Sequence, residues 1–142
     1  MTPPDSDVPA GFAPANFSPG FLDLAGPYFL KTDAKPPIVG CRVLPQHRNY
    51  LEMAHGGMLA TMADVALSWA VYASEDPPLP VSTVSMTTQF LGPARVGDWL
   101  EAIGHIDRIG KTLAYVHGSI LCGERCLMTM SAVFHVARAR PV

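Results

Sequence analysis

The sequence predicts an α+β domain in which a curved antiparallel β-sheet wraps around one long central helix. Two features of the 142-residue chain lead to this prediction. Residues 58–73 carry hydrophobic side chains on nearly every side of a helix, which is typical of a helix buried inside a protein. The second half of the chain is rich in β-forming residues and is divided by turn signals that contain glycine. These signals separate four expected strands, at residues 81–91, 99–108, 113–122 and 126–137.

The part of the chain before the helix is expected to be less regular, and its first twenty or so residues are expected to build no regular structure. Five prolines fall within the first twenty residues, and proline fixes φ and removes a backbone hydrogen-bond donor. We therefore expect residues 1–26 to form a proline-rich, partly mobile arm, followed by a single domain over residues 27–142. The local elements expected here are a helical turn at 21–24, strands at 28–32 and 38–44, and a loop at 47–54.

Composition limits the classes of partner. Charged residues make up only 15% of the chain and hydrophobic residues 49%, which is a low charge content for a monomer, so we expect a homo-oligomer. The formal net charge is −2 and no basic cluster is present, so no nucleic acid partner is expected. The first residues lack the pattern of a secretory signal, and the longest apolar run is too short to cross a bilayer comfortably. We expect a cytoplasmic protein with no membrane partner.

The cysteines and histidines do not predict a metal site. Cys41, Cys122 and Cys126 are odd in number and lack CxxC spacing, which argues against a disulfide framework or a structural zinc ion. His47 and the histidines of the second half of the chain have no close ligand spacing. We expect reduced cysteines, histidines that lie singly on strands or loops, and no metal or cofactor.

A candidate catalytic group lies within the apolar helix. Thr61, Asp64 and Ser68 are spaced three and four residues apart, so they form one narrow polar stripe on a single helix face. An ionised carboxylate in apolar surroundings costs several kcal/mol unless it is compensated. Asp64 is therefore either a structural aspartate held by hydrogen bonds or a catalytic one.

A candidate binding site for an acceptor atom lies at the start of the same helix. Gly56 and Gly57 come directly before the apolar run. Paired glycines allow close backbone approach, and the first N–H groups of a helix have no partner within the helix. These groups are expected to bind an oxygen atom of a ligand.

The motifs follow one another in a specific order and spacing: Asn49, His55-Gly56-Gly57, Asp64, Phe90-Leu91-Gly92-Pro93-Ala94-Arg95, Gly97-Asp98 and Gly110-Lys111-Thr112. In this order and spacing the chain resembles the PaaI-type acyl-CoA thioesterases of the hotdog fold. The resemblance covers roughly residues 45–137.

The resemblance implies a role for each site residue. The Gly57 N–H would polarise the thioester carbonyl, with His55 and Asn49 shaping that side of the site. Asp64 would supply the reactive carboxylate, as a general base or as a nucleophile, and Thr83 would hold the water. The resemblance also implies that Arg95 and Lys111 contact coenzyme A, which belongs to the substrate.

The resemblance implies a homodimer, or a dimer of dimers, with the active site at the subunit boundary. Helix geometry gives an independent reason to expect this. Gly57 and Asp64 are seven residues apart, hence about 10 Å apart along the helix axis at ~1.5 Å per residue. A second helix, antiparallel to the first, would place its Asp64 opposite the first helix's Gly57.

The expected activity is hydrolysis of an acyl-CoA thioester to free coenzyme A and a carboxylic acid. Aryl, short-chain and medium-chain acyl groups all remain open. Two alternatives are a hotdog enoyl-CoA hydratase or dehydratase, which needs an acid and base pair at one substrate carbon, and a non-catalytic protein that binds acyl-CoA.

Overall fold

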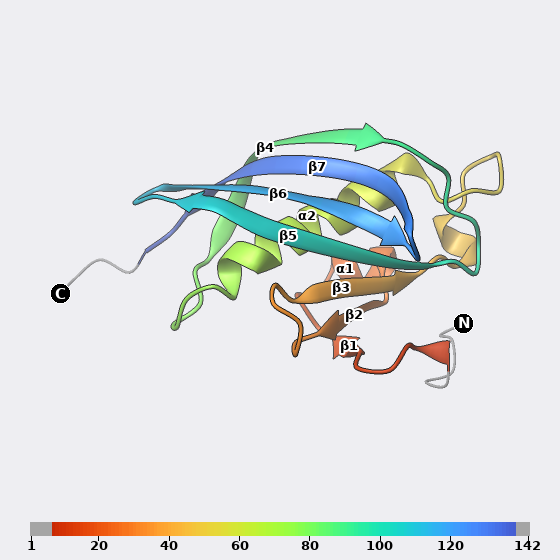
Figure 1. Ribbon diagram of the computed structural model, residues 1–142, viewed down its shortest axis with the longest axis horizontal. Helices are drawn as coiled ribbons and strands as arrows, with labels where there is room; N and C mark the ends of the chain where they lie inside the picture. The colour runs from red at the N-terminus through yellow and green to blue at the C-terminus, as the bar shows by residue number, and fades with distance from the viewer. Residues whose placement is uncertain (1–6, 139–142) are drawn as a thin grey trace.

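The computed structural model describes residues 7–138 and shows one long helix lying along a curved antiparallel sheet (Figure 1). In these residues the sheet has seven strands in the order β1-β2-β3-β5-β6-β7-β4. The elements are β1 (Ala13–Ala15), α1 (Phe21–Ala25), β2 (Tyr28–Lys31), β3 (Ile38–Arg42), the 3₁₀ turn η2 (Pro45–His47), α2 (Gly56–Tyr72), β4 (Val81–Phe90), β5 (Trp99–Ile109), β6 (Leu113–Cys122) and β7 (Arg125–Val136). The expected central helix and the four expected strands after it are confirmed.

The strand order places β4 at one edge of the sheet. Strands β5, β6 and β7 follow one another as antiparallel neighbours, and β4, which comes directly after α2, pairs with β7 rather than with β3. The other edge of the sheet is β1. The long edge strand β4 therefore lies beside α2 and has no neighbouring strand on its outer side within residues 7–138.

Helix α2 packs closely onto the sheet because the facing strand carries glycine. A Cβ atom on Gly104 of β5 would lie 3.2 Å from the Ala66 carbonyl oxygen and 3.2 Å from the Ala70 Cβ. This is tighter than ordinary packing, so only glycine lets the helix approach this far. The core between helix and sheet includes the fully buried side chains of Met62, Leu67, Leu100, Ile120, Met128 and Phe134.

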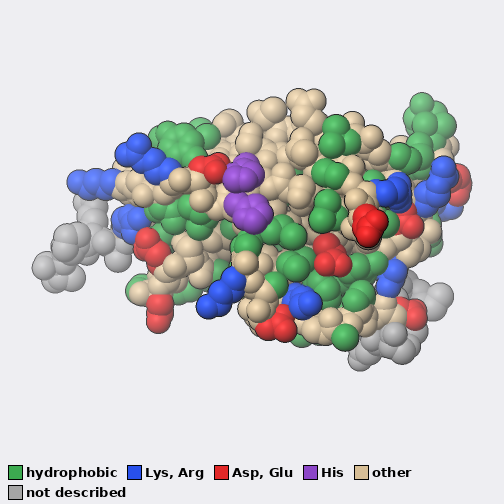
Figure 2. Space-filling view, in the orientation of Figure 1, with side chains coloured by type: hydrophobic (Ala, Val, Ile, Leu, Met, Phe, Trp, Pro, Cys, Tyr) green, Lys and Arg blue, Asp and Glu red, His purple; other side chains and the backbone are tan. Residues whose placement is uncertain are grey.

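The outer face of the sheet is polar. Its exposed side chains include the stacked pair His105 and His117, whose ring centroids are 5.4 Å apart, and Asp107, whose Oδ1 lies 2.7 Å from the His117 Nδ1. Figure 2 shows this face, with acidic, basic and histidine side chains spread among uncharged ones. An antiparallel sheet with one apolar and one polar face can expose the polar face to water.

The N-terminal segment is more ordered than the sequence predicts. The expectation that the first twenty residues build no regular structure is wrong at Ala13–Ala15, which pair with residues 28–30 as the edge strand β1. Pro14 is tolerated there because an edge strand leaves one side without ladder hydrogen bonds. The expected helical turn is confirmed by α1. The part of the expected arm at residues 1–6 lies outside the described residues.

The three cysteines are free thiols, and one of them is deeply buried. Cys41 in β3 is fully buried, and burial raises the pKa of its thiol to about 12. The thiolate is the reactive form, so we expect Cys41 to resist iodoacetamide in the native protein near neutral pH, whereas the exposed Cys126 is alkylated. Peptide mass mapping before and after unfolding checks this. Equal native labelling of both cysteines would contradict the burial of Cys41.

Candidate active site

Asp64 and Thr83 form a hydrogen-bonded pair between α2 and β4. The Thr83 hydroxyl donates to Asp64 Oδ1 at 2.7 Å. Asp64 is half-buried, and within residues 7–138 no hydrogen bond reaches its other carboxylate oxygen, Oδ2. The carboxylate is therefore not enclosed in the core. One oxygen is held by Thr83 and the other is available to a ligand or a water molecule.

A β-bulge in β4 aims Thr83 at the helix. The pairing of β4 with β7 shifts by one residue between Thr83 and Ser85, which leaves Val84 as the extra residue. Side chains alternate between the faces of a strand, so Thr83 and Met86 would lie on opposite faces without this shift. With the extra residue, both line the same pocket beside Asp64.

This carboxylate pocket has a volume of about 560 Å³ and opens to the surface. It is lined by Phe21, Leu22, Ala60, Thr61, Asp64, Val65, Ser68, Thr83 and Met86. The predicted polar stripe of α2 thus faces the pocket. The Thr61 hydroxyl donates to the Gly57 carbonyl at 2.8 Å and the Ser68 hydroxyl to the Val65 carbonyl at 3.0 Å. Among the lining residues, Asp64 is the only one with a charged side chain, because the hydroxyl groups of Thr61, Ser68 and Thr83 are neutral.

At the start of α2, the backbone N–H group that is free is not the one that the resemblance implies. His55 is the N-cap residue, and its Nδ1 accepts a hydrogen bond from the Gly57 N–H at 2.8 Å. The Gly57 N–H, expected to meet the thioester carbonyl, is thus already engaged. Within residues 7–138 the N–H of Gly56, the first residue of α2, has no acceptor. Because Nδ1 is an acceptor, the neutral His55 ring carries its proton on Nε2.

Asn49 closes the loop before the helix. Its Oδ1 accepts hydrogen bonds from the Leu51 N–H at 2.9 Å and the Met53 N–H at 3.1 Å. Its side-chain amide nitrogen makes no hydrogen bond within the described part of the chain. Asn49 and Gly56 both line a second pocket of about 340 Å³. The remaining lining residues are Met53, Ala54, Leu59 and Phe90–Ala94.

His47 positions this loop, a role that the sequence did not predict. The ring is buried, its Nδ1 accepts from the Leu44 N–H at 2.9 Å, and its Nε2 lies 3.0 Å from the Gly26 carbonyl oxygen. A carbonyl can only accept, so Nε2 is the donor. The His47 carbonyl in turn accepts the His55 N–H at 2.7 Å. His47 therefore connects α1, η2 and the start of α2, and the sequence carries no signal for these contacts.

One chain does not bring the two pockets together. They share no lining residue, and Gly56 precedes Asp64 by eight residues on the same helix, or about 12 Å at ~1.5 Å per residue. The carboxylate of one chain is thus too far from the helix start of the same chain to act on one carbonyl group. Each chain therefore presents the carboxylate pocket and the pocket of Gly56 as two separate pockets.

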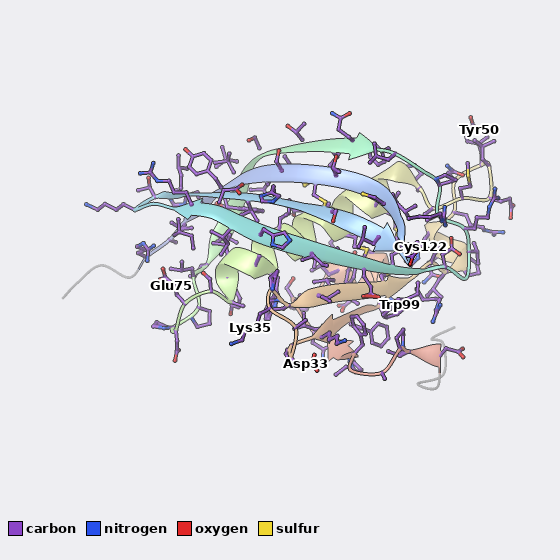
Figure 3. All side chains as sticks on the ribbon, viewed as in Figure 1. Asp33, Lys35, Tyr50, Glu75, Trp99 and Cys122 are labelled. Carbon is purple, nitrogen blue, oxygen red and sulfur yellow. The ribbon has the colours of Figure 1, made fainter. Side chains whose placement is uncertain are left out.

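Arg95 and Lys111 also lie far apart. They flank the two ends of β5, an 11-residue strand that spans about 33 Å at ~3.3 Å per residue. Arg138 donates to Glu75 and to the Gly110 carbonyl, so the turn at Lys111 lies at the Glu75 end of the molecule. Figure 3 shows Glu75 at one end, and Trp99, where β5 begins, toward the other. One chain therefore cannot place both cations on the same phosphate group.

Residues 7–138 offer neither a metal site nor a membrane-spanning helix. No group of three His, Cys, Asp or Glu side chains is placed to hold a metal ion there. No helix in this part of the chain is long and apolar enough to span a membrane.

A sheet curved around one long helix is the hotdog architecture. Residues 51–128, more than half of the chain, match the family model described as the Thioesterase superfamily. The chain belongs to this superfamily and is a thioester hydrolase.

Similar proteins agree with this assignment. The chain is 42% identical over 131 residues to a "Putative esterase PA0474" of Pseudomonas aeruginosa, covering 92% of this chain and 98% of that one. It is 36% identical over 74 residues to "Acyl-coenzyme A thioesterase 13" of Mus musculus, covering 52% of each chain. The solved structure of the E. coli PaaI protein has the same fold, with a TM-score of 0.66 at 24% identity over 72% of each chain.

Proposed function

We propose that the protein hydrolyses acyl-CoA thioesters to free coenzyme A and a carboxylic acid. The observation that carries this proposal is the Asp64 carboxylate, which is held by Thr83 at the rim of a largely apolar pocket in a chain of the Thioesterase superfamily. The name of the mouse relative, an acyl-coenzyme A thioesterase, supports coenzyme A as the thiol.

Asp64 acts as a general base in this proposal. A water molecule bound by the free Oδ2 and by the Thr83 hydroxyl oxygen loses a proton to the carboxylate as its oxygen attacks the thioester carbonyl carbon. When the carbon–sulfur bond breaks, the sulfur leaves as the coenzyme A thiol and takes up the proton. Direct attack by Asp64 would instead form an anhydride that water then cleaves. The water route is favoured because the Thr83 hydroxyl oxygen lies where it can hold the attacking water beside the free Oδ2.

Negative charge on the carbonyl oxygen is stabilised by the Gly56 N–H at the start of α2. A free backbone N–H at a helix N-terminus is a preorganised donor in the field of the helix dipole. The amide nitrogen of Asn49, which lines the same pocket as Gly56, is a further donor. Gly57 contributes indirectly, since its N–H fixes the ring of His55.

The complete site is formed by two subunits. The carboxylate of Asp64 and the N–H of Gly56 are about 12 Å apart along one helix, so each meets its counterpart from a second chain related by a two-fold axis. The free edge of β4 supplies an interface next to both pockets. Its side chains include the exposed Val84 and Phe90, and Phe90 also lines the pocket of Gly56. We therefore propose that the protein assembles as a homodimer, or as a pair of such dimers.

Arg95 and Lys111 are proposed contacts for the phosphates of coenzyme A. Each is exposed at a turn, where a flexible cation can reach a phosphate oxygen. Because the two lie at opposite ends of β5, one coenzyme A molecule meets only one of them from a given subunit.

Thiol release from a panel of acyl-CoAs tests the function. We expect turnover of at least one of the phenylacetyl, benzoyl, butanoyl and octanoyl thioesters by the full chain. Crotonyl-CoA separates hydrolysis from hydration, because a hydratase would consume its double bond without releasing thiol. Binding of every thioester with no release of thiol would contradict the proposal and would identify a non-catalytic acyl-CoA-binding protein.

A further inference from the structure

The pocket that holds Asp64 does not end at the carboxylate. A second cavity of about 310 Å³ adjoins it and shares three of its lining residues, Leu22, Val65 and Ser68. The remaining lining residues are Phe17, Ser18, Trp69, Tyr72, Pro80 and Val81. Together the two cavities form a continuous groove, here called the acyl groove, along the C-terminal half of α2.

The acyl groove suits an unbranched apolar chain. Its far half contains no charged side chain, and the hydroxyl group of Ser68, where the two cavities meet, is already bonded to the Val65 carbonyl. From Asp64 to Tyr72 the helix advances eight residues, or about 12 Å at ~1.5 Å per residue. This length exceeds what a short acyl group or a single aromatic ring fills.

One wall of the groove comes from the segment before the family-matched residues 51–128. Phe17 packs against Trp69 with ring centroids 5.1 Å apart and against Tyr28 at 6.1 Å. Leu22 of α1 packs against the core. The segment is thus held in place by aromatic and apolar contacts, and Phe17 lines the far half of the groove.

Behind Phe17 lies a third cavity of about 470 Å³. It shares Phe17, Ser18 and Leu22 with the acyl groove, and its other walls come from residues 14–29. The Phe17 ring therefore lies, with Ser18 and Leu22, between the acyl groove and additional empty space. Truncation of this large side chain is expected to widen the groove toward the third cavity.

We infer that the acyl groove binds the acyl chain of a medium-chain acyl-CoA and that Phe17 sets the maximum chain length. This inference rests on the proposed function, because it places the thioester at Asp64 and runs the chain away from it toward Tyr72. Each methylene that becomes buried contributes about fourfold in affinity, from roughly 0.8 kcal/mol per group. Chain length is therefore read by how many methylenes fit before Phe17.

The test measures kcat/KM for butanoyl-, octanoyl- and tetradecanoyl-CoA in the wild-type protein, Phe17→Ala and Phe12→Ala. Phe12 is the matched control, since it lies in the same segment but packs on Trp99, with centroids 5.1 Å apart, away from the groove. We expect the wild type to prefer octanoyl-CoA. We expect Phe17→Ala to raise the ratio of tetradecanoyl to octanoyl turnover at least tenfold and Phe12→Ala to leave it unchanged.

A second variant does not depend on the packing of Phe17. Ser68→Leu places a larger side chain where the two cavities meet and breaks only a bond within the helix. It should lower the ratio of octanoyl to butanoyl turnover at least tenfold. Unchanged chain-length ratios in both variants, or a wild-type preference for short or aryl thioesters, would overturn the inference while leaving the thioesterase intact. Absence of thiol release from every substrate would instead overturn the proposed function.

Discussion

Asp64→Asn is expected to lower kcat for the best acyl-CoA substrate by at least about 100-fold, the lower end for a positioned acid or base. The amide is nearly the same size as the carboxylate, and its oxygen can still accept the hydrogen bond that Thr83 donates to Oδ1. It cannot take a proton from water. The loss should therefore appear in kcat, measured by thiol release, with little change in the thermal unfolding temperature.

Asp107→Asn is the matched control for this variant. Asp107 is an exposed carboxylate on the outer face of the sheet, where its hydrogen-bond partner within residues 7–138 is His117. Exposed ion pairs contribute little to stability, so this variant should keep wild-type turnover and a wild-type unfolding temperature. If Asp64→Asn also kept more than a tenth of the wild-type kcat, Asp64 would be a structural residue.

Gly56→Pro is expected to lower kcat by about 100- to 1000-fold, the usual cost of removing one oxyanion donor. Proline lacks the backbone N–H proposed to bind the carbonyl oxygen. It otherwise suits this position, because Gly56 is the first residue of α2, where proline is favoured. His55 already has the extended backbone that a residue before proline requires, at ψ 138°.

Gly56→Ala distinguishes the effect on kcat of losing the N–H from the effect of adding side-chain atoms. A Cβ on Gly56 would lie 3.5 Å from the Phe90 ring, an ordinary contact, and the alanine keeps its N–H. We expect this variant to retain most of the wild-type kcat and both variants to show the far-ultraviolet circular dichroism of the wild type. An alanine variant as inactive as the proline variant would assign the loss to crowding near Phe90 rather than to the N–H.

Most of the fold could be predicted from the sequence because its signals are local. The apolar run of α2 and the glycine-containing turns between the last four strands each lie within a few residues of one another. Strand β1 was missed because three residues with a central proline carry no strand signal of their own. Its formation depends on pairing with β2, a contact between distant residues.

Of the candidate site, the closeness of Asp64 and Thr83 could be predicted, whereas the free N–H at the start of α2 and the separation of Arg95 from Lys111 could not. The spacing on α2 placed Asp64 on a polar stripe, and the resemblance selected Thr83, which the structure brings to 2.7 Å from Asp64. The side-chain conformation of His55 decides whether the N–H of Gly56 or of Gly57 is free. The spacing of residues in the sequence does not predict that conformation. The bulge that aims Thr83 at the helix depends equally on tertiary packing.

The central claim, that each active site combines Asp64 of one subunit with Gly56 of another, is tested most directly by pairing the two inactive variants. Asp64→Asn and Gly56→Pro chains are co-expressed with different affinity tags, and hybrid pairs are isolated through both tags. In a hybrid pair, one of the two shared sites contains both an intact carboxylate and an intact N–H, so we predict about half of the wild-type thiol release per pair. Hybrid activity no higher than that of the parent variants would contradict the shared site and would require both groups to act within one chain.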